Sequence, residues 1–338
     1  MTRVAHVMAG AVNGGAELFF ERLCLALQAA GEDVLPVIRR DAARAARLRA
    51  GGLPPAQLGF GTALDLLTRP RLAGLLGRFA PRVVVAWMNR ANIHTPRGDW
   101  ALVGRLGGYY DLRHYRRCDH LVGNTRGIVG WLRAQGWADA RTHYLPNFVA
   151  DFAATPPAAD LPAGGKLLLG LGRLHSDKGF DLAIRALPRL PGTVLAIAGD
   201  GPERDDLQAL ARREGVAGRV HFLGWRHDAG ALLRAADLFV CSSRIEPLGN
   251  IVIEAWSAGC PVVAAAAAGP AELLRDGSDG SVVPVEDPAA LAEGIAALLD
   301  DATRRTAFAQ AGRARFEAEF AAAPVVARWR GFLAGVAG

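Results

Sequence analysis

Two glutamates eight residues apart form the most informative chemical pattern in the sequence. Glu246 stands in a predicted loop, and Glu254 lies inside a helix predicted for residues 251–258. Residues 248–250 lie at the start of that helix, where unpaired backbone N–H groups can hold a phosphate. The two carboxylates could accept hydrogen bonds from the hydroxyl groups of a sugar or a ribose. The alternative is that both form ion pairs at the surface.

A second pattern places two cations in the loop between a predicted strand and a predicted helix. Arg173 and Lys178 follow the strand predicted for residues 167–171. Ligands of α/β proteins bind at the carboxyl ends of strands. Arginine can grip a phosphate with two hydrogen bonds, and lysine adds a mobile point charge. The pair therefore predicts a phosphate site, with two solvated loop cations as the alternative.

Two glycine-rich turns also connect a predicted strand to a predicted helix. In the first turn, Gly14 and Gly15 precede the helix predicted for residues 16–30, and backbone N–H groups there could approach an anion. In the second turn, Gly201 precedes Pro202, where a helix can begin. Each turn could instead be purely architectural.

The elements that must position these residues repeat along the chain. Short apolar runs rich in β-branched residues alternate with helical patterns, which predicts parallel sheets with crossover helices. Residues 151–165 are rich in Pro, Ala and Gly and lack periodicity, so they indicate a linker. We therefore expect an α/β protein with two doubly wound, Rossmann-like domains at residues 1–150 and 151–318. A final helix at about residues 319–338 could pack back on the first domain.

Composition narrows the class of protein. A length of 338 residues suits two domains, and 51% hydrophobic residues are typical of a globular chain. The net charge of +6 favours anionic partners, while no nucleic-acid-binding motif is present, so we expect no nucleic acid partner. Four widely spaced cysteines predict buried thiols. Because neither a signal peptide nor a long apolar run is visible, we expect a cytoplasmic protein.

Taken together and in their order along the chain, the four patterns are similar to those of the family-4 retaining glycosyltransferases. The likeness covers nearly the whole chain and includes residues 222–224 and the Pro146-Asn147 pair at the expected domain boundary. It implies the GT-B fold, in which two Rossmann-like domains face each other across a cleft.

The resemblance assigns roles to individual residues. Arg173, Lys178 and Glu246 form the implied catalytic set, with the two cations on the diphosphate of a nucleotide-sugar donor and Glu246 on the hydroxyls of the transferred sugar. Glu254 would bind the ribose. The other implied donor-binding residues are loop glycines, the border of the base pocket and the helix start, namely Gly14, Gly15, Gly172, Gly201, Trp225, Arg226, Leu248, Gly249, Asn250 and Ile251.

The implied reaction is transfer of a sugar, of the hexosyltransferase type, with retention of anomeric configuration. Arg173, Lys178 and the helix dipole would stabilise the charge of the departing diphosphate. A phosphate oxygen of the leaving group would take the proton of the acceptor hydroxyl. The resemblance therefore implies that the reaction needs no cofactor and no metal.

The acceptor side of the first domain is less defined by the resemblance. Many family members place a histidine near the sugar, and His94 is the candidate here, although a packed or solvated histidine is the alternative. Tyr109, Asp111 and Arg113 could border the acceptor instead.

Arginines recur at helical spacing in one segment of the first half. Arg40, Arg44 and Arg47 would form a cationic stripe on a helix. Such a stripe could face anionic lipid headgroups at a membrane, or it could be a solvated surface.

The amino-acid sequence of residues 246–256 is similar to that of enzymes of bacterial lipopolysaccharide and surface-polysaccharide assembly. This likeness implies a saccharide acceptor that is lipid-linked, and an enzyme at the inner face of the plasma membrane. Two alternatives stay open: a glycosyltransferase with a small soluble acceptor, and a non-catalytic scaffold that binds sugar nucleotides. In a non-catalytic scaffold we expect Arg173, Lys178 or one of the two glutamates to be lost. All four residues are present.

Overall fold

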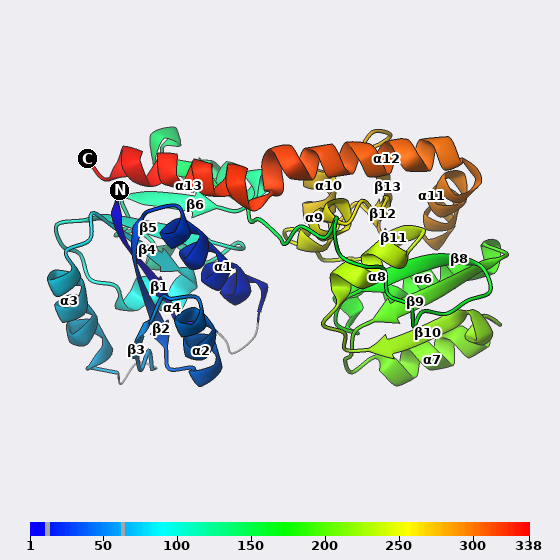
Figure 1. The fold of residues 1–338 in the computed structure, drawn as a ribbon, viewed down its shortest axis with the longest axis horizontal. Helices are drawn as coiled ribbons and strands as arrows, with labels where there is room; N and C mark the ends of the chain where they lie inside the picture. The colour runs from blue at the N-terminus through cyan, green and yellow to red at the C-terminus, as the bar shows by residue number, and fades with distance from the viewer. Residues whose placement is uncertain (11–13, 62–64) are drawn as a thin grey trace. The chain divides into compact units, whose positions relative to one another are not determined.

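The protein divides into two compact units in the computed structural model, which describes residues 1–10, 14–61 and 65–338 (Figure 1). The first unit comprises Met1–Phe148 together with Ala322–Gly338, and the second comprises Val149–Ala321. The first boundary therefore falls at Phe148 rather than at residue 150, and the last helix belongs to the first unit.

The first unit is built on a parallel sheet with the strand order β3-β2-β1-β4-β5-β6-β7. Its strands are β1 (Arg3–Met8), β2 (Asp33–Arg39), β3 (Ala56–Leu58), β4 (Val83–Trp87), β5 (Ala101–Leu106), β6 (His120–Gly123) and β7 (Thr142–Tyr144). Its helices are α1 (Gly15–Ala29), α2 (Ala42–Ala50), α3 (Thr68–Phe79), α4 (Met88–His94), α5 (Arg126–Ala134) and α13 (Ala322–Val336), with short turns η1 (Leu112–His114) and η2 (Asp139–Arg141). The order reverses between β1 and β4, where ligands of such sheets bind.

Both faces of the first sheet are covered, which explains why its central strand β4 is a continuous apolar run. All five residues of β4 are buried. One face packs against α1 and α13 through residues such as Phe20 and Trp329, and the other packs against α3 through Leu72 and Leu76. The core therefore fixes β1 and β4 in the middle of the sheet.

Helix α13 returns the end of the chain to the first unit. Trp329 is fully buried, with its ring 6.1 Å from that of His6 on β1. Arg330 donates to Glu32 at 2.7 Å, and the guanidinium of Arg82 donates to the carbonyl of Ala337 at 2.8 Å. Among the residues that the structure describes, no helix is long and apolar enough to span a membrane.

The second unit repeats the architecture with the strand order β10-β9-β8-β11-β12-β13. Its strands are β8 (Lys166–Leu171), β9 (Thr193–Ala198), β10 (Val220–Gly224), β11 (Leu238–Cys241), β12 (Val262–Ala265) and β13 (Ser281–Val283). Its helices are α6 (Phe180–Ala186), α7 (Arg204–Arg213), α8 (Ala229–Ala235), α9 (Asn250–Ser257), α10 (Ala268–Leu273), α11 (Pro288–Asp300) and α12 (Ala302–Arg315), with short turns η3 (Ser176–Lys178), η4 (Leu187–Arg189), η5 (Ala217–Arg219) and η6 (Phe316–Phe320). This order reverses between β8 and β11.

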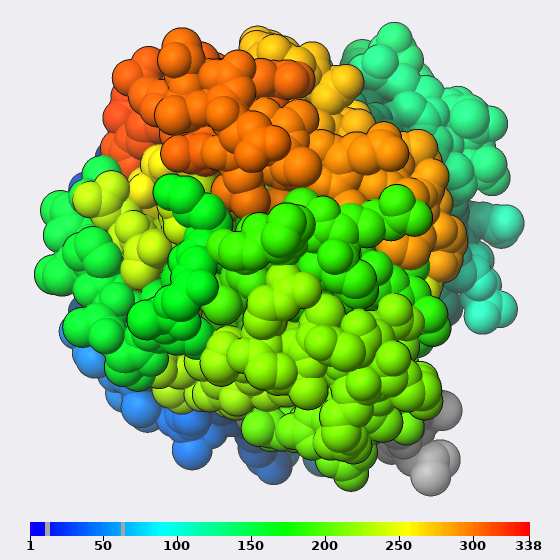
Figure 2. All heavy atoms as spheres, turned by 90° about the vertical axis from the view of Figure 1, so that its right-hand side faces the viewer, coloured from blue at the N-terminus to red at the C-terminus, as the bar shows by residue number. Residues whose placement is uncertain are grey.

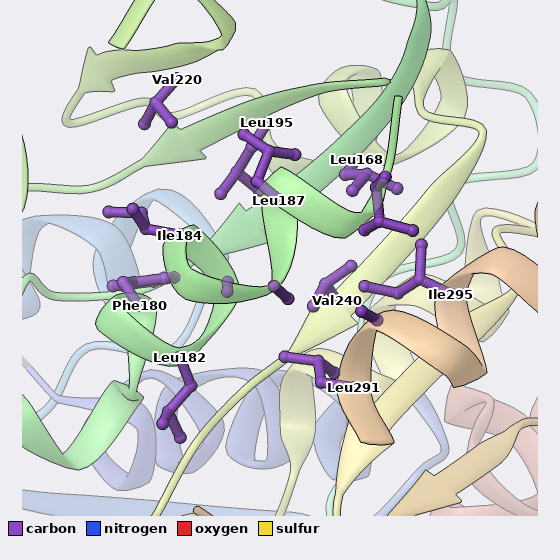
Figure 3. Packing of buried hydrophobic residues seen from close by; sticks show 14 of the residues in the cluster. Leu168, Phe180, Leu182, Ile184, Leu187, Leu195, Val220, Val240, Leu291 and Ile295 are labelled. Atoms are coloured by element: carbon purple, nitrogen blue, oxygen red, sulfur yellow. The ribbon is translucent and has the colours of Figure 1, made fainter. Parts of the chain in front are cut away.

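Side chains of α6 and α11 pack on the central strands of the second sheet. Ile184 and Leu291 belong to the same buried cluster as Leu168 and Val240 (Figure 3). Helix α11 contacts α6, and in the space-filling view the orange segment adjoins the green one (Figure 2). Helix α11 begins after Asp287, whose carboxylate caps two backbone N–H groups, so the sequence marks the start of this covering layer.

The cysteine prediction is confirmed. Each cysteine is a buried free thiol, and the four are Cys24, Cys118, Cys241 and Cys260.

Candidate functional site

The strongest sequence patterns meet at the centre of the second sheet. Arg173 and Lys178 follow β8, and Glu246 follows β11. These two strands are neighbours, and the strand order reverses between them. Side chains that are 68 residues apart in the sequence therefore come together at the carboxyl edge of the sheet, where α/β folds bind ligands.

Lys178 and Glu246 are in direct contact. The Nζ atom of Lys178 donates to Oε2 of Glu246 at 2.5 Å, and the backbone N–H of Gly249 donates to Oε1 at 3.2 Å. The side chains of Lys178 and Glu246 are 27% and 12% exposed. The carboxylate is thus fixed between a cation and the first N–H of a helix, while the ammonium keeps hydrogen-bonding capacity for a ligand.

Glycines allow the backbones of the loops that follow β8 and β11 to approach each other closely. Gly179 has φ 61°, and a Cβ there would overlap the carbonyl oxygen of Ser242. The hydroxyl of Ser242 donates in turn to the carbonyl of Lys178 at 3.1 Å. Gly172 has φ 147°, a backbone conformation that favours glycine, and a Cβ there would be in ordinary contact with the Lys178 side chain at 3.4 Å.

Gly201 has a packing role in the neighbouring turn. A Cβ on this residue would overlap the backbone of Leu174, and the N–H of Leu174 donates to the carbonyl of Asp200 at 3.0 Å. These contacts match the architectural alternative, because the turn supports the loop that carries Arg173.

Helix α9 presents its N-terminus beside Glu246. Gly249, with φ 74°, caps the helix, and Asn250 is its first residue. Leu248 lies directly before the cap. The N–H of Gly269 donates to the carbonyl of Glu246 at 2.7 Å and holds this turn in place. Glu254 lies one turn along the helix and is half-buried, and Ile251 is in the first turn. The predicted helix start is therefore in the right place for its N–H groups to meet an anion.

Arg173 is exposed on the same loop. In the described parts of the chain it forms no ion pair, unlike Lys178. Its guanidinium is therefore available to bind an external anion.

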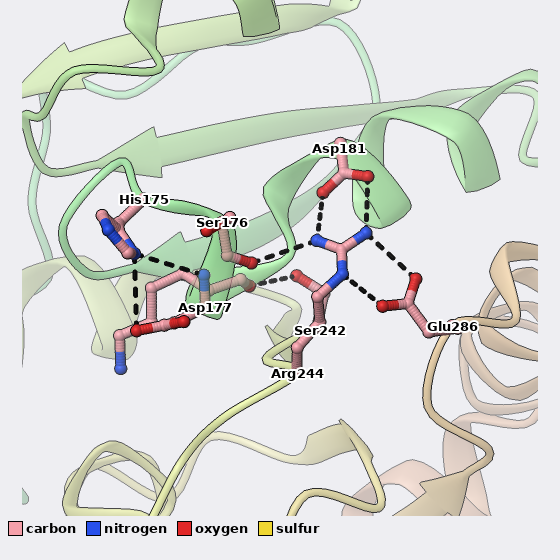
Figure 4. A network of polar contacts seen from close by, with 8 residues as sticks. His175, Ser176, Asp177, Asp181, Ser242, Arg244 and Glu286 are labelled. Atoms are coloured by element: carbon pink, nitrogen blue, oxygen red, sulfur yellow. Dashed lines mark hydrogen bonds and ion pairs between the residues drawn. The ribbon is translucent and has the colours of Figure 1, made fainter.

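Sequence reasoning missed the network that joins the two loops. Arg244 forms ion pairs with Asp181 at 2.6 Å and with Glu286, and its guanidinium also donates to the carbonyl of Ser176 at 3.1 Å (Figure 4). The backbone N–H groups of residues 244 and 245 both donate to the carbonyl of Asp177. Two carboxylates raise the pKa of Arg244, so it stays charged and fixes the Lys178 loop to the Glu246 loop.

The two residues at the implied base pocket differ in availability. Trp225 is 66% exposed, with its ring 6.2 Å from that of His227. Arg226 forms ion pairs with Asp160 and Asp228, both at 2.6 Å, and the hydrogen bonds that it donates to Asp228 and Asp160 raise its pKa. Trp225 is therefore free to stack on a base, whereas the charge of Arg226 is already compensated.

The glycine turn of the first unit holds a carboxylate that was not predicted. Gly14 caps α1 and Gly15 begins it, while residues 11–13 of the same turn lie outside the described residues. A Cβ on Gly10 or Gly14 would overlap the carboxylate of Glu17, which is buried. The glycines thus make room for Glu17, a role that only the spacing of Gly14 and Glu17 on one helix turn could have indicated.

The acceptor-side candidates lie on two neighbouring segments of the first unit, the end of α4 and the loop at residues 109–113. His94 is buried at the end of α4 with its ring edge-on to Phe60, which matches the packed alternative. Tyr109 is exposed and contacts Trp131. Asp111 and Arg113 form an ion pair at 2.7 Å on the lining of a polar pocket of about 760 Å³. The structure therefore places Tyr109, Asp111 and Arg113 in one loop, and the turn η1 in this loop contacts α4, the helix that carries His94.

The predicted cationic stripe is wrong for Arg44. Its side chain is 1% exposed and pairs with Glu21 at 3.0 Å and with Asp41 at 3.4 Å. Arg47 is half-exposed and binds the other oxygen of Glu21 at 2.7 Å, and Arg40 precedes α2. These arginines fasten α2 to α1 around a buried carboxylate, so Arg44 cannot face a membrane.

Comparison with known proteins identifies the family of this chain. Residues 151–315 match the family model described as glycosyl transferases group 1. The chain is 35% identical to the lipopolysaccharide core biosynthesis glycosyltransferase LpsE of Rhizobium meliloti (strain 1021), over 94% of this chain and 95% of the relative. It is 34% identical to LpsD of the same organism, over 94% of each chain.

The fold also agrees with a solved structure. The Anabaena protein Alr3699/HepE in complex with UDP is similar with a TM-score of 0.83 and 21% identity, over 98% of this chain and 100% of that chain. The predicted α/β architecture with two Rossmann-like units, the GT-B fold, is confirmed. The family resemblance is also confirmed, and this chain belongs to the group 1 family of glycosyl transferases.

Proposed function

We propose that this glycosyltransferase moves a hexosyl group from a nucleoside-diphosphate sugar to a hydroxyl of a saccharide acceptor in lipopolysaccharide core assembly. The names of the two Rhizobium meliloti relatives support the pathway. The contact of Lys178 with Glu246 beside the N-terminus of α9 carries the assignment of the donor site. Exposed Arg173 on the same loop supplies a second cation for a diphosphate.

Each residue of this site has a role in the proposed reaction. Arg173, Lys178 and the N–H groups at the start of α9 offset the charge that develops on the departing diphosphate. The ammonium of Lys178 has three donors, so it can hold Glu246 and a phosphate oxygen at once. Glu246 accepts hydrogen bonds from hydroxyls of the transferred sugar, and Glu254 accepts hydrogen bonds from the ribose. Trp225 stacks on the base.

The proposed transfer proceeds with retention and uses groups of the substrates for the proton. The bond from the anomeric carbon to the diphosphate breaks, and a bond from the same carbon to the acceptor oxygen forms on the same face. The proton of the acceptor hydroxyl passes to a phosphate oxygen of the leaving group. The roles proposed for Arg173 and Lys178 supply charge stabilisation without a metal cofactor.

The acceptor is proposed to be a lipid-linked saccharide at the inner face of the plasma membrane, with the enzyme in the cytoplasm. A small soluble acceptor is the second candidate, because Arg44 is buried and the cationic stripe that would contact lipid is reduced to Arg40 and Arg47. Sedimentation with anionic vesicles separates the two acceptors: binding supports the first and its absence supports the second.

Calorimetric titration with nucleoside diphosphates tests the proposed donor site. UDP comes first, because the Anabaena protein with the similar fold was solved in complex with UDP, followed by GDP and ADP. Selective binding of one nucleotide that is lost in Arg173→Ala supports the proposal. Arg212→Ala, an exposed arginine on α7, serves as the matched control. Absence of binding for every nucleotide would favour the non-catalytic scaffold.

A further inference from the structure

Two histidines that the proposed reaction does not use lie in contact at one side of the first sheet. His120 begins β6, and His143 is the central residue of β7, the last strand in the order of the sheet. Val122 is paired with His143 in the parallel register of these strands. Because side chains alternate along a strand, His120 and Val122 lie on the same face. Both imidazoles therefore share one face of the sheet.

The two rings present nitrogen atoms to each other. The Nδ1 atom of His120 lies 3.1 Å from the Nε2 atom of His143. A metal–imidazole bond is about 2.0–2.1 Å long, and two such bonds to one ion across this separation enclose an angle of about 95–100°. This value lies between the angle of about 90° in octahedral or square-planar sites and that of about 109° in tetrahedral sites. The separation therefore suits two imidazoles that bind a single metal ion.

The surroundings hold both rings in place. The ring of Phe332 on α13 lies 4.7 Å from that of His143 and 6.3 Å from that of His120. The ring of His120 also forms a hydrogen bond with the backbone of Ala140. Since its Nδ1 atom faces His143, the Nε2 atom is left for this bond. A backbone carbonyl behind the second ring nitrogen is the usual support of a metal-binding histidine, because it directs the lone pair of the first nitrogen to the ion.

Both rings are neutral at neutral pH, as a metal ligand must be. Burial lowers the pKa of each histidine, and it lowers that of His143 to about 4. The charged groups around the pair are mixed: Asp119 favours a cation at His120, whereas Arg141 and Arg133 oppose one. Charge alone therefore does not attract a cation to this place, and the affinity has to come from the bonds to nitrogen.

Space for further ligands lies beside the pair. A pocket of about 500 Å³ is lined by both histidines, by Phe332 and by the last residues of α13. Across the residues that the structure describes, no third His, Cys, Asp or Glu joins the pair in a group that could hold an ion. Water molecules in the pocket would therefore complete the coordination, which makes this an open site with an exchangeable ion.

We propose that His120 and His143 together bind one divalent transition-metal ion, with water as the remaining ligands. Imidazole suits Cu²⁺, Ni²⁺ and Zn²⁺, whereas Mg²⁺ and Ca²⁺ take oxygen ligands. The bound ion ties β7, an edge strand of 3 residues, to its neighbour β6. It therefore stabilises the first unit. It takes no part in the proposed sugar transfer, whose cations and carboxylates belong to the second unit.

Titration of the full-length protein with Ni²⁺, in a buffer without chelators, tests this site. We expect Ni²⁺ to bind to the wild-type chain and Mg²⁺ not to bind. A free Ni²⁺ concentration about tenfold above its Kd should raise the Tm by about 3–6 °C, and excess EDTA should reverse the shift. A pair that is only hydrogen-bonded predicts the same Tm with and without Ni²⁺, and that result overturns the proposal.

Variants assign the ion to the pair. H120Q and H143Q should each weaken Ni²⁺ binding by about tenfold or more, since even the loss of a hydrogen-bond partner behind a metal ligand costs about 10–100-fold. H227Q, at an exposed histidine of the second unit, is the control and should bind Ni²⁺ as the wild-type chain does. Wild-type affinity in both pair variants overturns the proposal, as does an equal effect of H227Q.

A spectrum of the wild-type protein decides the question even if H120Q or H143Q fails to fold. With Cu²⁺ bound at one ion per chain, electron paramagnetic resonance should show hyperfine coupling to two imidazole nitrogens. Coupling to a single imidazole nitrogen, or to none, overturns the proposal.

Discussion

The ammonium of Lys178 lies 2.5 Å from one carboxylate oxygen of Glu246, and both residues stand at the reversal point of the second sheet. Each side chain thereby restricts the other. The lysine holds the carboxylate in one orientation, and the carboxylate keeps the lysine over the loop.

Removal of either partner should therefore reduce turnover. We expect Lys178→Ala or Glu246→Ala to lower kcat by about 10²-fold or more, because each removes an electrostatic contact to the reacting groups. Initial rates with the selected sugar nucleotide measure this effect. Lys166→Ala is the matched control, since Lys166 also forms a Lys–carboxylate pair, with Asp237, at the opposite end of β8. Unchanged turnover in both site variants would contradict the donor-site assignment.

Loss of Arg244 should affect stability and donor binding together. Arg244→Ala leaves Asp181 and Glu286 without their cation, so we expect the free energy of unfolding to fall by about 1–3 kcal/mol. The Lys178 loop also loses its tether, so the KM for the donor should rise. Urea unfolding and donor titration measure the two effects. A stable variant with an unchanged KM would show that the network does not position the loop.

A methyl group at Gly179 should separate the two loops. Gly179→Ala introduces a clash with the carbonyl of Ser242 and adds backbone strain at φ 61°. Gly192→Ala is the control, because Gly192 has φ 69° but open space around its Cβ position. We expect Gly179→Ala to be less stable than Gly192→Ala by about 1–3 kcal/mol. Equal stabilities would show that the close approach is relaxed at low cost.

Stability should fall in mild acid through His6. Burial lowers the pKa of His6 from 6.5 to about 3, and its Nδ1 atom accepts the indole N–H of Trp87 at 3.1 Å. The unfolded chain therefore binds a proton at pH values where the folded chain does not. The contribution is fully present above pH 6.5 and is lost as the pH falls toward 3, and the loss at pH 5 is about 2 kcal/mol.

Urea unfolding at pH 7.5 and pH 5 checks this dependence. His6→Gln should show a smaller loss of stability between the two pH values than the wild-type chain. His227→Gln, at an exposed histidine, should show the same loss as wild type. A loss of stability between the two pH values that is as large in His6→Gln as in the wild-type chain would contradict this expectation.

Local patterns were sufficient to predict the elements and the main loops. The strand predicted for residues 167–171 is β8 (Lys166–Leu171), and the helix predicted for residues 251–258 is α9 (Asn250–Ser257). Arg173 and Lys178 could be found because the glycines and cations of one strand–helix connection are contiguous in the sequence. The reversal of strand order then brings Glu246 to them.

Contacts between distant segments could not be predicted in this way. Arg244 was overlooked because its carboxylate partners are 63 and 42 residues away. Arg44 was assigned to a surface because the spacing of arginines says nothing about Glu21, which is 23 residues upstream on another helix. The spacing of residues shows which side chains share one face of a helix. It does not show which segment packs against that face, because this depends on how the helices and the sheet pack together.

The return of α13 to the first unit sets an order for folding during synthesis. Residues 149–321 form the second unit as one continuous segment, which is complete once residue 321 has left the ribosome. The first unit begins earlier but lacks the buried Trp329 until the last residues emerge. The half of the protein that is translated first is therefore the half that is finished last, and a nascent chain stalled before α13 exposes the apolar face of α1 and the adjoining strands.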